Sequence, residues 1–158
     1  MERERGRSGL TRERSEMFET VVVGADGSPT AAEAVQQAVE LVKLTGGRLH
    51  IVTAYKPQQL GSSDRDTDQY LKSLGSHYLA DSLLAELASM GKAAGVAVET
   101  HPSTSAPANA ICEVAAEVKA DLIVVGNKGM SGVRRVLGSV PNSVAHQAPC
   151  AVLIASTS

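Results

Sequence analysis

Residues 121–156, DLIVVGNKGMSGVRRVLGSVPNSVAHQAPCAVLIAS, give the clearest indication of how this chain folds. Residues 122–125 (LIVV) are a continuous apolar run rich in β-branched side chains, which is typical of a parallel strand buried on both faces. A short helix is predicted over 141–147, because Pro is favoured at the first helical position. Residues 151–154 (AVLI) predict a final strand. The stretch therefore indicates a strand, a glycine-rich loop, a short helix and a strand.

The loop after residue 125 has the composition of an anion-binding loop. Gly126 and Gly129 are followed by the pair Gly138 and Ser139, and glycine allows backbone N–H groups to approach a bound group closely. The Ser139 hydroxyl and the N-terminus of the helix predicted at Pro141 would face the same anion. Two glycines alone are weak evidence, since most such pairs only form turns. The second glycine-serine pair favours a phosphate site.

Strand and helix patterns alternate along the rest of the chain. A buried strand at 20–23 precedes a helix that Ser28 and Pro29 begin. The other predicted elements are a strand at 49–55, a long exposed loop at 56–68 that is either a lid or simply mobile, a helix at 69–94, a weaker strand at 96–100 and a helix around 111–118. Five strands alternating with helices predict an α/β fold, a doubly wound five-stranded parallel sheet with helices on both faces. We expect the strand order 3-2-1-4-5, which places the first and fourth strands side by side.

Two parts of the sequence resemble the universal stress protein family. Gly126-x-x-Gly129, followed by Gly138-Ser139-Val140 and the final strand, is similar to the nucleotide-binding signature of that family. Residues 21–28 (VVVGADGS) resemble its first strand and the following loop, which bears an Asp. Asp26 stands at that place, and the resemblance extends over about residues 20–156.

The resemblance implies a cytoplasmic stress-response protein that binds ATP or another adenine nucleotide, with Mg²⁺ accompanying ATP, and acts by nucleotide-dependent signalling or interaction. It implies contact of Asp26 with the nucleotide, although the residues alone favour a turn-forming Asp before Gly27. The backbone of Ala54 is similar in position to the residue that meets the adenine. The residues expected at the site are Gly24, Ala25, Asp26, Ala54, Gly126, Asn127, Gly129, Met130, Gly138, Ser139 and Val140.

The loop leaves other functions open. Residues 130–137 are one residue fewer than is usual in the ATP-binding pattern of the family, which favours a dimeric interaction module that binds no nucleotide. A preference for cyclic AMP and a slow ATPase activity are further alternatives. The chain lacks the Walker sequence GxxxxGK[ST] and a G-x-S-x-G elbow. A binding protein is therefore favoured over a fast enzyme, and we assign no catalytic residue.

Composition argues against several classes of partner. The formal net charge of −2 and a pI near 6.1 give no electrostatic reason to expect nucleic acid. The sequence has no apolar run long enough to span a membrane and no secretory signal, so we expect a cytoplasmic protein. Residues 1–17, in which Arg and Glu alternate, are predicted to form a mobile tail, and 18–158 a single domain.

The histidines and cysteines suggest no metal site. His50 is predicted in a strand and His101 in a loop, and the four histidines have no HxxxH or HxH spacing. Cys112 and Cys150 lack CxxC spacing and are expected to be buried free thiols.

The final strand predicts an assembly. In the order 3-2-1-4-5, residues 151–154 lie at the edge of the sheet, where unpaired N–H and C=O groups would meet water. A two-fold related copy of the same strand can pair with it. We expect a homodimer through this strand, as the resemblance also implies, and a monomer with a short, tolerated edge is the alternative.

Overall fold

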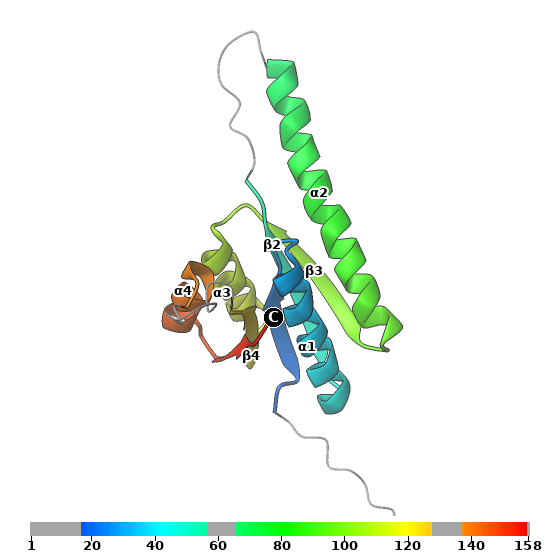
Figure 1. Cartoon of the computed structure of the whole chain (residues 1–158), viewed down its shortest axis with the longest axis vertical. Coiled ribbons are helices and arrows are strands. Elements are labelled where there is room, and N and C mark those ends of the chain that lie inside the picture. The colour runs from blue at the N-terminus through cyan, green and yellow to red at the C-terminus, as the bar shows by residue number, and fades with distance from the viewer. Residues whose placement is uncertain (1–16, 57–65, 128–136, 158) are drawn as a thin grey trace, which may run out of the picture.

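The structure is a computed structural model that describes residues 17–56, 66–127 and 137–157 (Figure 1), with the side chains of the second helix described from Gly75 onward. In chain order its elements are β1 (Thr20–Gly24), α1 (Pro29–Thr45), β2 (Arg48–Ala54), α2 (Asp66–Ala93), β3 (Ala97–Ser103), α3 (Pro107–Glu117), β4 (Leu122–Gly126), α4 (Ser139–Gln147) and β5 (Ala151–Ala155). The strands form one parallel sheet in the order β3-β2-β1-β4-β5. The predicted fold class and strand order are confirmed.

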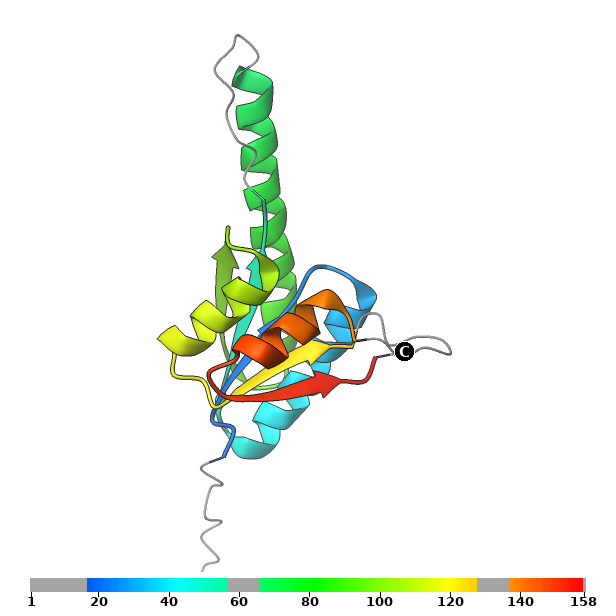
Figure 2. The same cartoon turned by 90° about the vertical axis from the view of Figure 1, so that its left-hand side faces the viewer.

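Helices cover both faces of this sheet (Figures 1 and 2). Val21, Val23 and Val124 pack on one face against α1 and α2. Val22 and Ile123 pack on the other face against α3 and α4. Because successive side chains of a strand point to opposite faces, β1 and β4 must be apolar at consecutive positions to contribute to both layers.

Local signals fix the ends of the elements. The Ser28 hydroxyl accepts a hydrogen bond from the backbone N–H of Ala31 at 3.2 Å and caps α1, which begins at Pro29. At the other end of the sheet, the Asp121 carboxylate accepts hydrogen bonds from the backbone N–H groups of Glu19 (2.9 Å) and Thr20 (3.1 Å). These bonds tie the start of β4 to the start of β1.

Several predicted boundaries were wrong. Helix α2 begins at Asp66, so the last residues of the predicted loop are helical, and residues 57–65 of that loop lie outside the described residues. Strand β3 continues to Ser103, which places His101 in a strand and not in a loop. The strand tolerates Pro102 because it lies at the edge of the sheet, where a missing N–H donor is not costly.

The two cysteines also differ from expectation. Both are free thiols, as expected, but each is half-buried and not fully buried. Burial raises the pKa of the Cys112 thiol and of the Cys150 thiol. Both groups are therefore protonated and poorly reactive at neutral pH.

The long helix α2 extends beyond the sheet, past the carboxyl end of β2 (Figures 1 and 2). None of the described helices has both the length and the apolar character needed to cross a membrane. The predicted tail falls almost entirely on residues 1–16, which lie outside the described residues, and the division into a tail and one domain stays a prediction.

Candidate functional site

A concave pocket lies where the carboxyl ends of β1, β2 and β4 meet the first turns of α1, α3 and α4. The strand order reverses between β1 and β4, and ligands of doubly wound sheets bind at such points. The pocket has a volume of about 680 Å³, which includes the space open to solvent at its mouth.

The turn after β1 holds a carboxylate at this pocket. The backbone N–H of Ala25 donates a hydrogen bond to the Val52 carbonyl at 2.9 Å, which fixes the turn to β2. Oδ1 of Asp26 accepts a hydrogen bond from the backbone N–H of Ser28 at 3.0 Å. Gly27 has a φ of +82°, a conformation that favours glycine. Asp26 therefore shapes the turn, as the residues alone indicated, and its exposed side chain also lines the pocket.

One wall of the pocket is apolar. Val52 and Ala54 come from β2, and Ile111 comes from α3. A Cβ atom added to Gly24 would lie 2.4 Å from Cδ1 of Ile111. A side chain at position 24 would therefore require the Ile111 side chain to move.

The N-terminus of α4 lies beside the same pocket, since Val140 and Pro141 of its first turn line it. Gly138 occupies the N-cap position, and no side chain caps the helix there. The first backbone N–H groups of a helix have no partner within it and carry its positive partial charge. The backbone N–H groups of Ser139 and Val140 can therefore bind an anion, whereas Pro141 has no N–H to contribute.

The structure brings together part of the predicted site. Of the residues expected there, those that line the pocket are Gly24, Ala25, Asp26, Ala54, Gly126 and Val140. Gly138 and Ser139 lie at the start of α4, next to the lining residues. Gly129 and Met130 lie outside the described residues.

The Asn127 side chain has a structural role. Its Oδ1 accepts hydrogen bonds from the backbone N–H (3.1 Å) and the hydroxyl of Thr157. These bonds fasten the segment after β5 to the end of β4. Asn127 is not among the described residues that line the pocket, and its contact with a ligand stays a prediction.

Sequence reasoning missed the pocket residues supplied by the helices. Thr30 and Ser28 lie at the start of α1, Pro107 and Ile111 in α3, and Pro141 in α4. Their sequence signals are those of helix starts and of an apolar helix face, which have structural explanations of their own. These residues could have been assigned to the site only by reasoning that, in a doubly wound sheet, the helices begin beside the carboxyl ends of the strands.

The structure also brings together two histidines that appeared scattered in the sequence. Nδ1 of His50, on β2, lies 2.9 Å from Nε2 of His101, on β3. Spacing along the chain did not reveal this pair because its members come from neighbouring strands.

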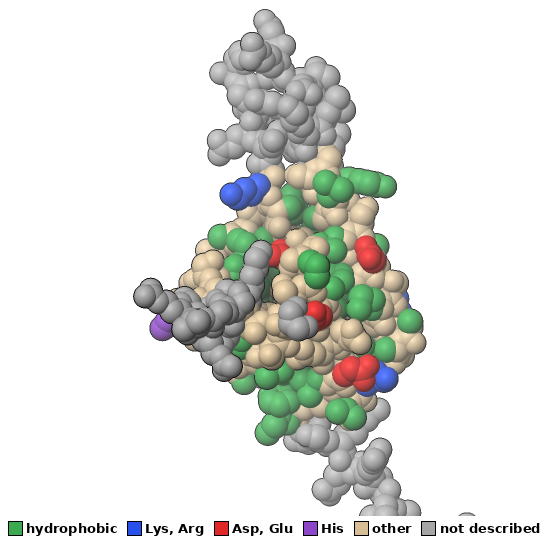
Figure 3. Space-filling model, viewed as in Figure 1, with side chains coloured by type: hydrophobic (Ala, Val, Ile, Leu, Met, Phe, Trp, Pro, Cys, Tyr) green, Lys and Arg blue, Asp and Glu red, His purple; other side chains and the backbone are tan. Residues whose placement is uncertain are grey.

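Charged side chains of the described residues are scattered on the face shown in Figure 3, and both signs occur. No basic patch of the described residues gathers on that face.

Sequence comparison and structure comparison both find universal stress proteins among the relatives of this chain. A model of the universal stress protein family matches residues 17–156. A universal stress protein of Mycobacterium tuberculosis is 37% identical over 143 residues, which cover 89% of this chain and 97% of that protein. A solved universal stress protein in complex with cAMP is 41% identical with a TM-score of 0.70, and the match covers 89% of this chain and 99% of that one.

A more distant structure, the universal stress protein from Archaeoglobus fulgidus in complex with dAMP, shares the fold with a TM-score of 0.60 at 23% identity, over 87% of this chain and 98% of that one. The family match covers almost the whole described fold, and solved members of the family share that fold. On these grounds, the chain belongs to the universal stress protein family.

Proposed function

We propose that this protein binds an adenine nucleotide in the pocket at the carboxyl ends of β1, β2 and β4. The observation that carries the proposal is the combination, in one pocket, of an apolar wall, a carboxylate and an uncapped helix N-terminus. A nucleotide has three matching parts, namely a flat apolar base, a ribose with hydroxyl donors and an anionic phosphate.

Each part has a place in the proposed complex. The base packs against Val52, Ala54 and Ile111, where apolar contact stabilises it. The Asp26 carboxylate accepts a hydrogen bond from a ribose hydroxyl or, with ATP, holds Mg²⁺ through water. A phosphate group meets the first N–H groups of α4.

The sequence favours binding over rapid turnover. The chain lacks the Walker sequence GxxxxGK[ST], whose lysine and hydroxyl hold the γ-phosphate and Mg²⁺ in fast phosphoryl-transfer enzymes. We therefore propose that nucleotide binding controls signalling or interaction in a stress response, and that any hydrolysis is slow.

Cyclic AMP is a second candidate ligand beside ATP. The specific observation in its favour is the cAMP complex of a family member 41% identical to this chain. The shorter segment between Gly129 and Gly138 is a sequence feature that sets the chain apart from the usual ATP-binding pattern.

We further propose a homodimer formed through β5, which lies at one edge of the sheet next to β4. Leu153 in the middle of this strand is 42% exposed. A second copy pairing with β5 would cover this side chain and satisfy the edge N–H and C=O groups. The expected cytoplasmic location rests on the sequence alone.

Calorimetric titration with ATP, ADP, AMP and cyclic AMP, with and without Mg²⁺, tests the nucleotide proposal. We expect at least one of these ligands to bind, and the variant Ala54→Leu, which adds bulk to the apolar wall, to lose about tenfold or more in affinity, since overpacking costs roughly 1–3 kcal/mol. Ala97→Leu makes the same change at an exposed strand position outside the pocket and is the control. The proposal fails if no nucleotide binds the unaltered protein, which would favour an interaction module, or if both variants bind equally well.

A further inference from the structure

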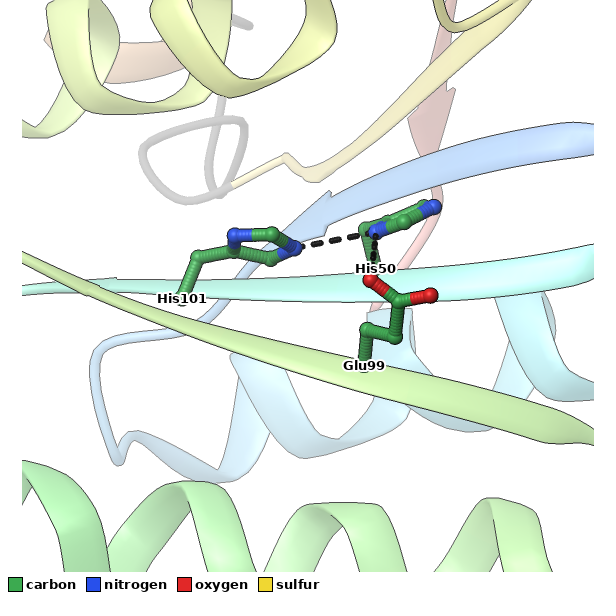
Figure 4. A group of neighbouring side chains, drawn as sticks. All are labelled: His50, Glu99 and His101. Atoms are coloured by element: carbon green, nitrogen blue, oxygen red, sulfur yellow. Dashed lines mark hydrogen bonds and ion pairs between the residues drawn. The ribbon is translucent and has the colours of Figure 1, made fainter. Parts of the chain in front are cut away.

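His50, Glu99 and His101 form a compact group on the two strands at the β3 edge of the sheet (Figure 4). One nitrogen or oxygen atom from each side chain lies within 4.8 Å of the others. Nδ1 of His50 lies 2.9 Å from Nε2 of His101 and 3.7 Å from Oε2 of Glu99. Among the described residues, this is the group of three whose atoms converge in this way.

The pairing of β2 with β3 holds the group in place. His50 is in register with Glu99, and Val52, two residues further along β2, is in register with His101. Because side chains alternate between the faces of a strand, Glu99 and His101 project to the same face. Strand β2 is itself paired on both sides, so the group rests on a rigid part of the backbone.

The distances fit a small transition-metal ion. Zn²⁺ binds nitrogen and carboxylate oxygen at roughly 2.0–2.2 Å with tetrahedral geometry, which places two ligand atoms about 3.3 Å apart. The separations of 2.9 Å and 3.7 Å lie on either side of this value. The third separation, between Glu99 and His101, is at most 4.8 Å, so metal binding requires the side chains to rotate toward a common centre.

The exposure of the group also suits a metal. His50 is only 3% exposed and is held within the sheet. The Glu99 side chain is 62% exposed, so the group is open to solvent on that side.

The polar contacts of the His50 ring are all on its Nδ1 side. Its other nitrogen, Nε2, is buried without a hydrogen-bond partner among the described residues and faces away from Glu99 and His101 (Figure 4). In the 2.9 Å hydrogen bond between His50 Nδ1 and His101 Nε2, one of the two nitrogens carries the proton. A metal ion would replace this proton, with each ring as the tautomer that carries its hydrogen on the other nitrogen, so that both facing nitrogens present an electron pair beside the Glu99 carboxylate.

We propose that His50, Glu99 and His101 bind a divalent transition-metal ion, with Zn²⁺ as the ion best matched to two imidazoles and one carboxylate, and with a fourth position open to water. The site is separate from the nucleotide pocket, which includes Val52 and Ala54 of β2 but none of the three ligands. The inference does not depend on nucleotide binding.

The test is a calorimetric titration of tag-free, metal-stripped protein with Zn²⁺ alone, without nucleotide, at pH 7.5. We expect one Zn²⁺ per chain, and Co²⁺ in its place should give the visible absorption of a tetrahedral site. His101→Ala should weaken binding by more than the roughly 10–100-fold that follows loss of a group that only supports a ligand. Glu99→Gln should also weaken it. The variants change His101 and Glu99 because replacing the buried His50 would also disturb the packing of the sheet. Circular dichroism checks that each variant is folded.

His77→Ala is the matched control. His77 also pairs with a carboxylate, its Nδ1 lying 3.0 Å from Oδ2 of Asp81, but the pair belongs to no described group of three ligands. This variant should bind Zn²⁺ as the unaltered protein does, and so should the double variant Cys112→Ser/Cys150→Ser. The proposal is overturned if the unaltered protein does not bind Zn²⁺, if folded His101→Ala binds as tightly as His77→Ala, or if the loss of the cysteines abolishes binding.

Discussion

Asp26 has two roles in this account, and two substitutions separate them. Its Oδ1 accepts the hydrogen bond from the backbone N–H of Ser28 that shapes the turn after β1. Its negative charge, at the pocket, is proposed to hold a ribose hydroxyl or Mg²⁺. Asp26→Asn keeps an acceptor oxygen for Ser28 and removes the charge. Asp26→Ala removes both.

The loss of the charge should lower nucleotide affinity, and the loss of the turn hydrogen bond should lower folding stability. A hydrogen bond to a charged acceptor contributes roughly 1.5–3 kcal/mol, which corresponds to a loss of about 10- to 150-fold in nucleotide affinity. Because Asp26 is exposed, water screens its charge, and we expect the lower end of this range. The turn hydrogen bond joins neutral backbone to the side chain near the surface, so its loss should cost about 0.5–1.5 kcal/mol of folding stability in Asp26→Ala alone.

Titration calorimetry and thermal melting of the same samples check both expectations. Asp26→Asn should melt near the temperature of the unaltered protein and bind the nucleotide more weakly. Asp26→Ala should show both effects. If Asp26→Asn is stable and binds with unchanged affinity, the carboxylate makes no contact with the ligand and Asp26 is only a turn residue.

Three further predictions follow from the structure. Gly47→Ala should destabilise the protein by about 1–3 kcal/mol, because its Cβ would lie 2.3 Å from the backbone oxygen of Glu19. Gly75→Ala, whose Cβ would have no atom within 4 Å, should instead stabilise helix α2 by about 0.5–1 kcal/mol. Chemical denaturation measures both changes in unfolding free energy, and equal changes would contradict the close contact between Gly47 and Glu19. Burial lowers the folded-state pKa of His50 below the ordinary value of 6.5, so the unfolded chain binds the proton more readily and stability should fall as pH drops below 6.5. Melting temperatures measured between pH 7.5 and 5.5 in EDTA should show this fall in stability. If the His50→Gln variant shows the same fall, a group other than His50 is responsible for it. Ala151→Lys/Leu153→Lys, at exposed positions of β5, should give a folded monomer by light scattering, and a mutant that stays dimeric would place the contact on another surface.

The central part of the fold could be predicted because its signals are local. The apolar run of β4 and the Ser28 cap followed by Pro29 each require one kind of element. The sequence also placed the turn at Asp26 near the end of β4, because the carboxyl ends of adjacent parallel strands meet at one edge of a sheet. The pattern failed at β3, where the edge position permits Pro102 and exposed polar side chains.

Other features depend on contacts between distant residues, which no local pattern encodes. Asn127 follows the glycine that ends β4 and looks like part of a binding loop, yet its amide oxygen is bonded to Thr157. Ile111 carries only the signal of an apolar helix face, although it also forms a wall of the pocket. His50 and His101 are brought together by the register of two strands, which the sequence does not specify.

The most direct test of the central claim is to map the nucleotide on the protein by NMR. Backbone amide shifts of ¹⁵N-labelled protein are recorded while the tightest-binding adenine nucleotide is added. The account predicts that the largest changes occur at the strand ends and the start of α4, at Ala25, Asp26, Ala54 and Val140. Changes confined to another surface, such as the shallow depression on α1 formed by Glu33, Gln36, Gln37 and Glu40, would contradict it.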